Sequence, residues 1–105
     1  MSYKLAGVTF ESRQELLEKI YNNKNRFIKC ILNRTMYNGE PAIQVIEESS
    51  ALQIGWIAKV DVPKLYNLPC NFIHGEIGKY MNTWFCELYS PIMDRRKVHP
   101  FRLSR

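Results

Sequence analysis

The sequence predicts a mainly β fold in which six short strands close into a small barrel that carries two short helices. Three observations support this expectation. The chain has 105 residues, the length of a single domain, and 46% of them are hydrophobic, which is enough for a core. Short apolar runs rich in strand-forming residues are separated by polar turn residues. Connections this short favour antiparallel pairing, and closing the strands into a ring avoids bare strand edges.

The N-terminal residues predict a strand followed by a helix. Residues 3–10 alternate their side chains with the period of two that is typical of a strand. Ser12 and Glu15 then have the spacing of a capping box, in which each side chain accepts a hydrogen bond from the backbone amide of the other. Apolar residues follow at helical spacing, so we expect a helix of about ten residues that ends near Asn23.

The next two strands are expected to form a hairpin. Residues 26–34 and 42–46 are apolar and rich in strand formers. Asn38-Gly39 lies between them and is typical of a two-residue turn with positive φ. Such a turn needs no further loop residues. Arg34, at the end of the first run, and Tyr37, between the two runs, therefore require a structural or a functional explanation.

A polar turn and a further strand come next. Glu47 and Glu48 open the polar segment 47–51, and we expect both to be solvated at a strand end. Neighbours on a strand point to opposite faces, so the two carboxylates make a poor acid–base pair. Residues 52–57 predict a strand, and Gly55 within it indicates a bulge or the close approach of another backbone.

The remaining part of the domain predicts a short helix and two more strands. Asp61 is a suitable N-cap, and Pro63 follows in the first turn. Residues 71–80 and 83–89 are the last two strands, joined around Met81-Asn82. The predicted order is therefore β-α-β-β-β-α-β-β, which fits an OB-like or SH3-like barrel of the α+β class.

The charge of the chain is concentrated at its C-terminal end. The net charge is +5, and residues 94–105 contribute +4 of it, because five basic residues stand there against Asp94. Residues 1–93, with ten basic and nine acidic residues, carry only +1. We therefore expect a nearly neutral barrel domain over residues 1–93 and a basic tail over residues 94–105, which either solubilises the protein or attracts polyanions. The cations of the tail are Arg95, Arg96, Lys97, Arg102 and Arg105.

The cysteines and histidines argue against a disulfide framework and against a zinc site. Cys30, Cys70 and Cys86 are odd in number and have no Cys-x-x-Cys spacing, which fits reduced thiols in the cytoplasm. His74 and His99 are the only histidines, so we expect no structural metal. No apolar run approaches the length of a membrane span, and the N-terminus lacks the apolar region of a secretory signal.

The sequence contains no motif that is typical of an enzyme active site. It has no nucleotide-binding glycine loop, no His-Glu-x-x-His and no Gly-x-Ser-x-Gly elbow. Cys30 and Cys86 lie in apolar strands, where a buried and inert thiol is the expected state. We therefore expect a protein that is not an enzyme and that binds no cofactor.

Several short motifs, in order and at matching spacing, resemble the HIRAN domain family over residues 4–90. The matching segments are residues 5–10, 12–14, 32–45, 54–57 and 82–85. The resemblance implies a six-stranded OB-like barrel with two helices. It also implies a ligand, because HIRAN domains of fork-remodelling ATPases hold the 3′ end of single-stranded DNA. The family also includes small free-standing prokaryotic and phage proteins, which this chain resembles in size.

The resemblance implies several contacts with nucleic acid. Phe10 and Trp84 match aromatic residues that stack on bases, while Trp56 and Lys59 match positions that contact phosphate or sugar. Aromatic faces stack on any base for about 1–3 kcal/mol each, and a lysine neutralises phosphate. Phe10 is also typical of a core residue, and Trp56 could equally fill the barrel. Of Trp84 and its neighbour Phe85, only one can face the core.

The hairpin loop carries the rest of the expected site. Tyr37 and Asn38 match the family's aromatic–acidic pair, which holds the terminal nucleotide and its 3′-hydroxyl. Asn38 stands in place of the acidic residue and has no charge, so a weaker contact is expected. Arg34 offers a cation for phosphate, although it is equally suited to an ion pair with Glu11 or Glu40.

We expect a non-catalytic module that binds nucleic acid, with single-stranded DNA and its 3′ ends as the favoured ligand, in DNA repair, replication or the biology of phages and mobile elements. The basic tail would guide the ligand electrostatically, and a helicase or nuclease partner would supply catalysis. The alternative is a protein-interaction module that uses an exposed edge strand or an apolar patch including Met36, Met81 and Met93.

Overall fold

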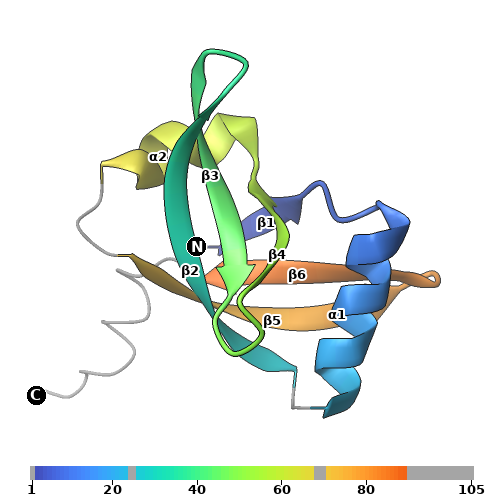
Figure 1. Cartoon of the computed structure of the whole chain (residues 1–105). Helices are drawn as coiled ribbons and strands as arrows, with labels where there is room; N and C mark the ends of the chain where they lie inside the picture. The colour runs from blue at the N-terminus through green and yellow to red at the C-terminus, as the bar shows by residue number, and fades with distance from the viewer. Residues whose placement is uncertain (1, 24–25, 68–70, 90–105) are drawn as a thin grey trace, which may run out of the picture.

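A computed structural model of the chain describes residues 2–23, 26–67 and 71–89 (Figure 1). Within these residues six antiparallel strands close into a ring, so the predicted fold class is confirmed. The elements in chain order are β1 (Ser2–Ala6), α1 (Glu11–Asn23), β2 (Phe27–Tyr37), β3 (Glu40–Glu47), β4 (Leu52–Ile57), the short 3-10 helix η1 (Lys59–Asp61), α2 (Val62–Tyr66), β5 (Phe72–Tyr80) and β6 (Thr83–Tyr89). Cys70, Met93, His99 and the basic tail lie outside the described residues.

The strands follow the order β1-β4-β3-β2-β5-β6 around the ring, and β6 pairs with β1 to close it. β2 pairs with two neighbours, through residues 27–31 with β5 and through residues 30–37 with β3. Beyond Ile31, β2 no longer pairs with β5. The β2–β3 hairpin therefore projects beyond the ring, as Figure 1 shows at the top of the view. This projecting hairpin forms one wall of a pocket.

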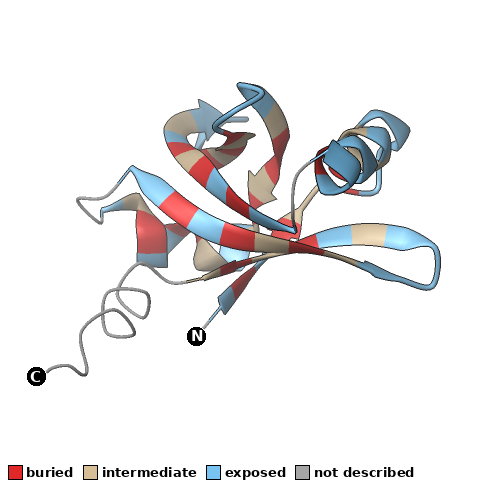
Figure 2. Ribbon diagram, turned by 90° about the horizontal axis from the view of Figure 1, so that it is seen from below, coloured by how far each residue is buried: buried red, intermediate tan, exposed pale blue. Residues whose placement is uncertain are grey.

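The core lies inside the ring, where alternate strand residues are buried (Figure 2). α1 contributes Leu17 and Ile20 from one side, and α2 contributes Val62 and Leu65 from the other. Most of the strand residues between them are aliphatic, so the ring is filled by side chains. The ring interior therefore leaves no room for a ligand site.

Cys30 and Cys86 are buried in this core, at 0% and 2% exposure, so the prediction of buried thiols is confirmed for both. Burial raises the pKa of both thiols, that of Cys86 to about 12. The two thiols therefore stay protonated at neutral pH, and a protonated thiol is a poor nucleophile.

β1 ends at Ala6, well before the predicted boundary at position 10. Gly7 has a φ of +69°, a left-handed conformation that ends the strand. A Cβ on Gly7 would lie 3.0 Å from Nη1 of Arg13 and 3.3 Å from Cδ1 of Trp56, so those two side chains meet over the glycine. Phe10 is consequently outside the strand alternation and is 64% exposed, so its interpretation as a core residue is wrong.

α1 begins at Glu11, one residue before the expected N-cap at Ser12, so the predicted capping box is wrong. The carbonyl of Phe10 accepts hydrogen bonds of 3.0 Å from the amides of Arg13 and Gln14. This arrangement places Phe10 at the N-cap and Ser12 inside the first turn. The helix then runs for 13 residues in all, somewhat longer than expected.

α2 lies where the sequence predicts a helix, with Asp61 at its N-cap and Pro63 in its first turn. The side chain of Asp61 makes no capping hydrogen bond. Its carboxylate lies instead 3.4 Å from Nζ of Lys64, one turn further along the chain. The start of this helix is therefore set mainly by the backbone and by Pro63.

Gly55 in β4 confirms the expected close approach of another backbone. Its missing Cβ would lie 2.6 Å from the carbonyl oxygen of Ala6 and 2.6 Å from Cγ of Leu5. On the other side of β4, the register with β3 shifts between Val45 and Ile46. The glycine thus lets β1 and β4 approach each other at the point where the ring closes.

The expectation that Glu47 is solvated is wrong, because the residue is only 3% exposed. Its carboxylate accepts hydrogen bonds from the amide and hydroxyl of Ser49, at 3.1 and 2.6 Å, and from the amide of Ser50, at 2.9 Å. Burial by itself raises the pKa of Glu47, but these hydrogen bonds outweigh it and the net pKa is lowered. Glu48 stays exposed and lies 3.8 Å from Lys29.

The buried carboxylate predicts a pH-dependent stability. Because the pKa of Glu47 in the folded protein lies below its ordinary value of 4.5, the stability it contributes is complete above that pH and is lost as pH falls through the folded pKa. Glu47→Gln should lower the free energy of unfolding at pH 7 by about 1–3 kcal/mol and flatten the acid side of the pH profile. Urea denaturation between pH 3 and pH 7 measures both. Glu48→Gln is the matched control, with an expected change below about 0.5 kcal/mol, and a Glu47→Gln profile parallel to that of the wild type would contradict this role.

We expect Gly7→Ala, in the turn after β1, and Gly39→Ala to lower the free energy of unfolding by different amounts. Gly7 and Gly39 both have positive φ, +69° and +80°, so an alanine should cost roughly 1 kcal/mol at either position for backbone conformation. A Cβ on Gly39 would meet nothing within 4 Å, whereas on Gly7 it would meet Arg13 and Trp56. Gly7→Ala should therefore cost about 1 kcal/mol more than Gly39→Ala in urea denaturation, because it overpacks this contact. Equal losses would mean that the two side chains move aside freely.

Candidate functional site

The β2–β3 hairpin closes with the two-residue turn that its sequence predicts. Asn38 and Gly39 have φ values of +52° and +80°, and Tyr37 pairs directly with Glu40 across the turn. The strands extend as far as the turn, so Arg34 and Tyr37 lie in β2 rather than in a loop. Tyr37 is thereby held at the projecting tip, where it is 61% exposed.

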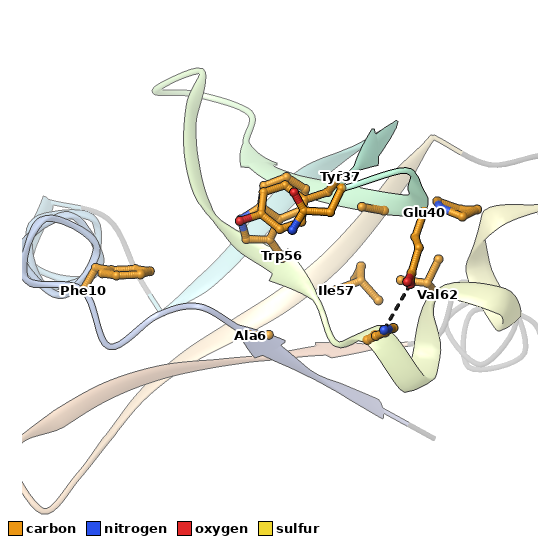
Figure 3. A pocket seen from close by; sticks show the side chains of 11 residues that line it. Ala6, Phe10, Tyr37, Glu40, Trp56, Ile57 and Val62 are labelled. Atoms are coloured by element: carbon orange, nitrogen blue, oxygen red, sulfur yellow. Dashed lines mark ion pairs between the residues drawn. The ribbon is translucent and has the colours of Figure 1, made fainter.

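One pocket, with a volume of about 480 Å³, brings five of the seven predicted site residues together (Figure 3). It lies between the hairpin tip, the end of β4 and the connection from β1 to α1. The predicted residues that line it are Phe10, Tyr37, Asn38, Trp56 and Lys59. The other lining residues are Ala6, Glu40, Pro41, Ala42, Ile57 and Val62. Segments far apart in the sequence thus converge on one open hollow.

Three aromatic rings stand around this pocket. The ring centroids of Tyr37 and Trp56 are 5.4 Å apart, with an angle of 51° between the planes. Figure 3 shows Phe10 on the α1 side of the hollow, away from that pair. Trp56 is half-buried and lines the pocket, so it does not fill the barrel. The arrangement offers apolar faces to a ligand from two sides.

The charges at the pocket balance each other. Nζ of Lys59 lies 3.1 Å from Oε1 of Glu40, and Figure 3 marks this ion pair at the mouth of the pocket. Both side chains are largely exposed, at 84% and 59%, so solvent screens the pair and its contribution to stability is small. The predicted phosphate contact of Lys59 therefore competes with a carboxylate that the chain itself supplies.

Arg34 lies away from the pocket and holds the end of α2. Its Nε donates to the carbonyl oxygen of Tyr66 at 2.6 Å, and its Nη2 donates to that of Leu65 at 3.2 Å. Its Nη1 donates to Oδ1 of Asn71 at 3.1 Å. A guanidinium at the C-terminus of a helix satisfies carbonyls that have no partner within the helix. These contacts favour the structural explanation of Arg34 over a contact with phosphate.

Trp84 also lies away from the pocket. It shares the inward-facing side of β6 with buried residues and packs, half-buried, on Tyr21 of α1, with ring centroids 5.0 Å apart. Phe85 faces the opposite side of the strand and is 41% exposed. Trp84 is therefore the member of this pair that faces the core, and its predicted stacking on a base would need a separate site.

Sequence reasoning missed two residues that support the pocket wall. Nε2 of Gln14 donates to the carbonyl oxygens of Val8, at 2.7 Å, and of Trp84, at 2.9 Å, while its Oε1 accepts from the amide of Trp84 at 2.7 Å. Gln14 thus ties the connection that carries Phe10 to β6. Arg13 precedes it, and its Nη1 donates to the carbonyl oxygen of Gly7, in the same connection, at 2.8 Å. The signal that could have found both is two long polar side chains in the first turn of a helix that begins four residues after a glycine.

The described part of the chain offers two negative findings. Among residues 2–23, 26–67 and 71–89, no three His, Cys, Asp or Glu side chains are placed to hold a metal ion. In the same residues no helix has the length and apolar character needed to cross a membrane.

A comparison with family models, curated proteins and solved structures finds no match for this chain. The resemblance to HIRAN domains, and the roles that it implies for individual residues, therefore stay predictions. What the site binds has to be argued from its geometry.

Proposed function

We propose that this protein is a non-catalytic module that binds single-stranded nucleic acid, with single-stranded DNA as the ligand, in the pocket between Phe10, Tyr37 and Trp56. One observation carries the proposal: the fold brings three aromatic rings from three separate segments to one open pocket. Two of these rings, those of Phe10 and Tyr37, are more than half exposed. Exposed rings around a hollow are the feature that single-strand binders use to stack bases.

The chemistry of the pocket also matches the parts of a nucleotide. Its floor is apolar, with Ala42, Ile57 and Val62 among the lining residues, which suits a flat base. Polar groups stand at the rim, where Asn38 can donate to and accept from a sugar hydroxyl and Lys59 can approach a phosphate. The division between apolar floor and polar rim follows the division between base and backbone.

The wider role follows the resemblance and the charge distribution. The basic tail of residues 94–105 would raise the encounter rate with a polyanion, because the barrel itself is nearly neutral. A domain without catalytic residues of its own would deliver a single strand, or its 3′ end, to a helicase or nuclease partner in DNA repair, replication or phage biology. Asn38 is the residue that would contact a 3′-hydroxyl.

A second candidate function is protein interaction through the tip of the β5–β6 hairpin. Met81 there has a φ of +49° and is 79% exposed, and its neighbour Tyr80 is 71% exposed. A methionine in this conformation costs roughly 1 kcal/mol or more, and such strain is often retained for a function. Met36 is exposed at the other hairpin, so the two methionines do not share one patch (Figure 1). Pro41 removes an amide from the projecting β2–β3 hairpin, which disfavours pairing with a partner strand there.

Removing either ring of the Tyr37–Trp56 pair should weaken binding of single-stranded DNA. Each of Tyr37→Ala and Trp56→Ala should cost about 1–3 kcal/mol of binding free energy, because a base loses one stacking face. Fluorescence anisotropy with labelled oligonucleotides that carry a free or a phosphorylated 3′ end measures this loss. Phe27→Ala, which removes a ring that is 56% exposed on β2 outside the pocket, is the control and should leave affinity unchanged.

The outcomes of this experiment separate the candidate functions. Preference for the free 3′ end, lost in Asn38→Ala, would extend the proposal to end recognition. Equal binding of both oligonucleotides would leave a general single-strand binder. Equal losses for Phe27→Ala and Tyr37→Ala would refute the pocket as the site. No binding at low salt would refute the proposed function and favour a protein partner at the Tyr80–Met81 tip.

The ion pair at the pocket mouth predicts a gain of affinity. Glu40→Gln should tighten binding of single-stranded DNA by roughly twofold to fivefold, because it frees Lys59 and removes a charge that repels phosphate. The gain should be largest at low salt, where screening is weakest. Glu48→Gln removes the same charge at an exposed position outside the pocket and serves as the control. Weaker binding by Glu40→Gln would instead identify the carboxylate as a ligand contact.

A further inference from the structure

A second hollow of about 480 Å³ adjoins the aromatic pocket on the α1 side. It lies between residues 12–19 of α1 and the start of β4. Its lining includes Ser12, Arg13, Glu15, Lys19 and Gln53. None of these residues lines the aromatic pocket. The two hollows nevertheless share a boundary, because the Arg13 guanidinium carbon lies 5.5 Å from the centre of the Phe10 ring.

Gly7 lies at that boundary, between Arg13 and Trp56. The position of its missing Cβ is 3.0 Å from Nη1 of Arg13 and 3.3 Å from Cδ1 of Trp56, so the guanidinium and the indole flank the same glycine. A side chain at this position would push them apart. A ligand that leaves the aromatic pocket past Trp56 therefore meets Arg13 first.

Arg13 has donors to offer. Within the described part of the chain its side chain makes a single hydrogen bond, from Nη1 to the carbonyl oxygen of Gly7 at 2.8 Å, and no carboxylate there forms an ion pair with it. A guanidinium carries five N–H donors in a planar fork, the geometry that binds phosphate with two parallel hydrogen bonds. The hydrogen bond to Gly7 and the ring of Phe10 hold this fork in place, so little freedom is lost on binding.

The charges of the two hollows differ. The aromatic pocket holds the balanced pair of Lys59 and Glu40. The second hollow holds Arg13 and Lys19 against Glu15, and in the described residues neither cation is paired with that carboxylate. A phosphate is therefore favoured in the second hollow over the first.

We propose that Arg13, with Lys19 behind it, binds a phosphate of the strand whose base occupies the aromatic pocket, so that the ligand backbone crosses Gly7 and spans at least two nucleotides. The inference rests on the proposed function and adds to it the path of the strand. It also replaces Arg34, which holds α2, as the predicted cation for phosphate, and it adds Arg13 to Lys59, whose charge Glu40 offsets.

The salt dependence of binding tests this path. Anisotropy titrations with a labelled oligothymidylate, at several salt concentrations, compare the wild type with Arg13→Gln, Arg13→Lys, Lys19→Gln and the charge-matched control Lys29→Gln. Lys29 lies eight residues along β2 from Tyr37, about 26 Å in an extended strand. Arg13→Gln should lower affinity about tenfold at low salt and reduce the slope of log affinity against log salt by about 0.7, the value of one phosphate contact on a single strand. Lys19→Gln should reduce the slope by less, and Lys29→Gln should not change it.

Arg13→Lys separates a phosphate contact from a merely structural role. It keeps the charge, so it should preserve the salt slope while losing part of the affinity that the fork supplies. If Arg13→Gln lowers the unfolding midpoint but leaves the slope at its wild-type value, the residue only supports the loop and the proposal is overturned. If Tyr37→Ala abolishes binding while Arg13→Gln behaves like Lys29→Gln, the proposed function stands and the path over Gly7 is wrong. If the wild type binds no oligonucleotide at low salt, both fail together.

Discussion

The closure of the ring by β1 is the constraint on which the rest of the structure depends. This strand has only five residues, and it divides them between two partners: residues 2–4 pair with β6, and Leu5 and Ala6 pair with β4. At this closure β4 comes close to β1, and Gly55 meets the carbonyl of Ala6 without room for a Cβ. The chain has then used its last strand residue and must turn at once, through the positive φ of Gly7.

The pocket is a consequence of this closure. Ala6 pairs with Trp56, and Trp56 pairs on its other side with Gln44 of the projecting hairpin, so three strands meet at the indole. The turn at Gly7 carries the chain over the same corner and leaves Phe10 outside the barrel. An aromatic residue that ordinary strand alternation would bury is thus available to a ligand. Trp56 is thus held by the strands that close the ring, while Tyr37 reaches the same pocket from the hairpin tip.

The sequence predicted the strands and helices well, because each follows from local periodicity or turn chemistry. It failed where the deciding partner is far away or is a backbone group. Glu47 looked like a solvated carboxylate, since its donors belong to a turn whose path the sequence does not specify. Arg34 looked like a ligand contact because its actual partners are backbone carbonyls at the end of α2. Every residue type has such a carbonyl, so the sequence carries no sign of this pairing. The resemblance singled out five of the residues that line the pocket, but it gave Arg13 no role, since only the turn at Gly7 brings that side chain to the boundary.

Most of the net positive charge of the chain lies outside the aromatic pocket. The aromatic pocket is electrically balanced by Lys59 and Glu40, while residues 94–105 carry +4 of the net charge of +5. Stacking on a ring does not depend on salt as ion pairing does, and it accepts every base. Under the proposed function, long-range charge would set how fast a polyanion arrives, whereas the rings would decide whether an unpaired base is present to be held. A duplex would be attracted by the same charge but keeps its bases stacked inside, so the neutrality of the pocket is what would let this protein release a duplex and retain a single strand.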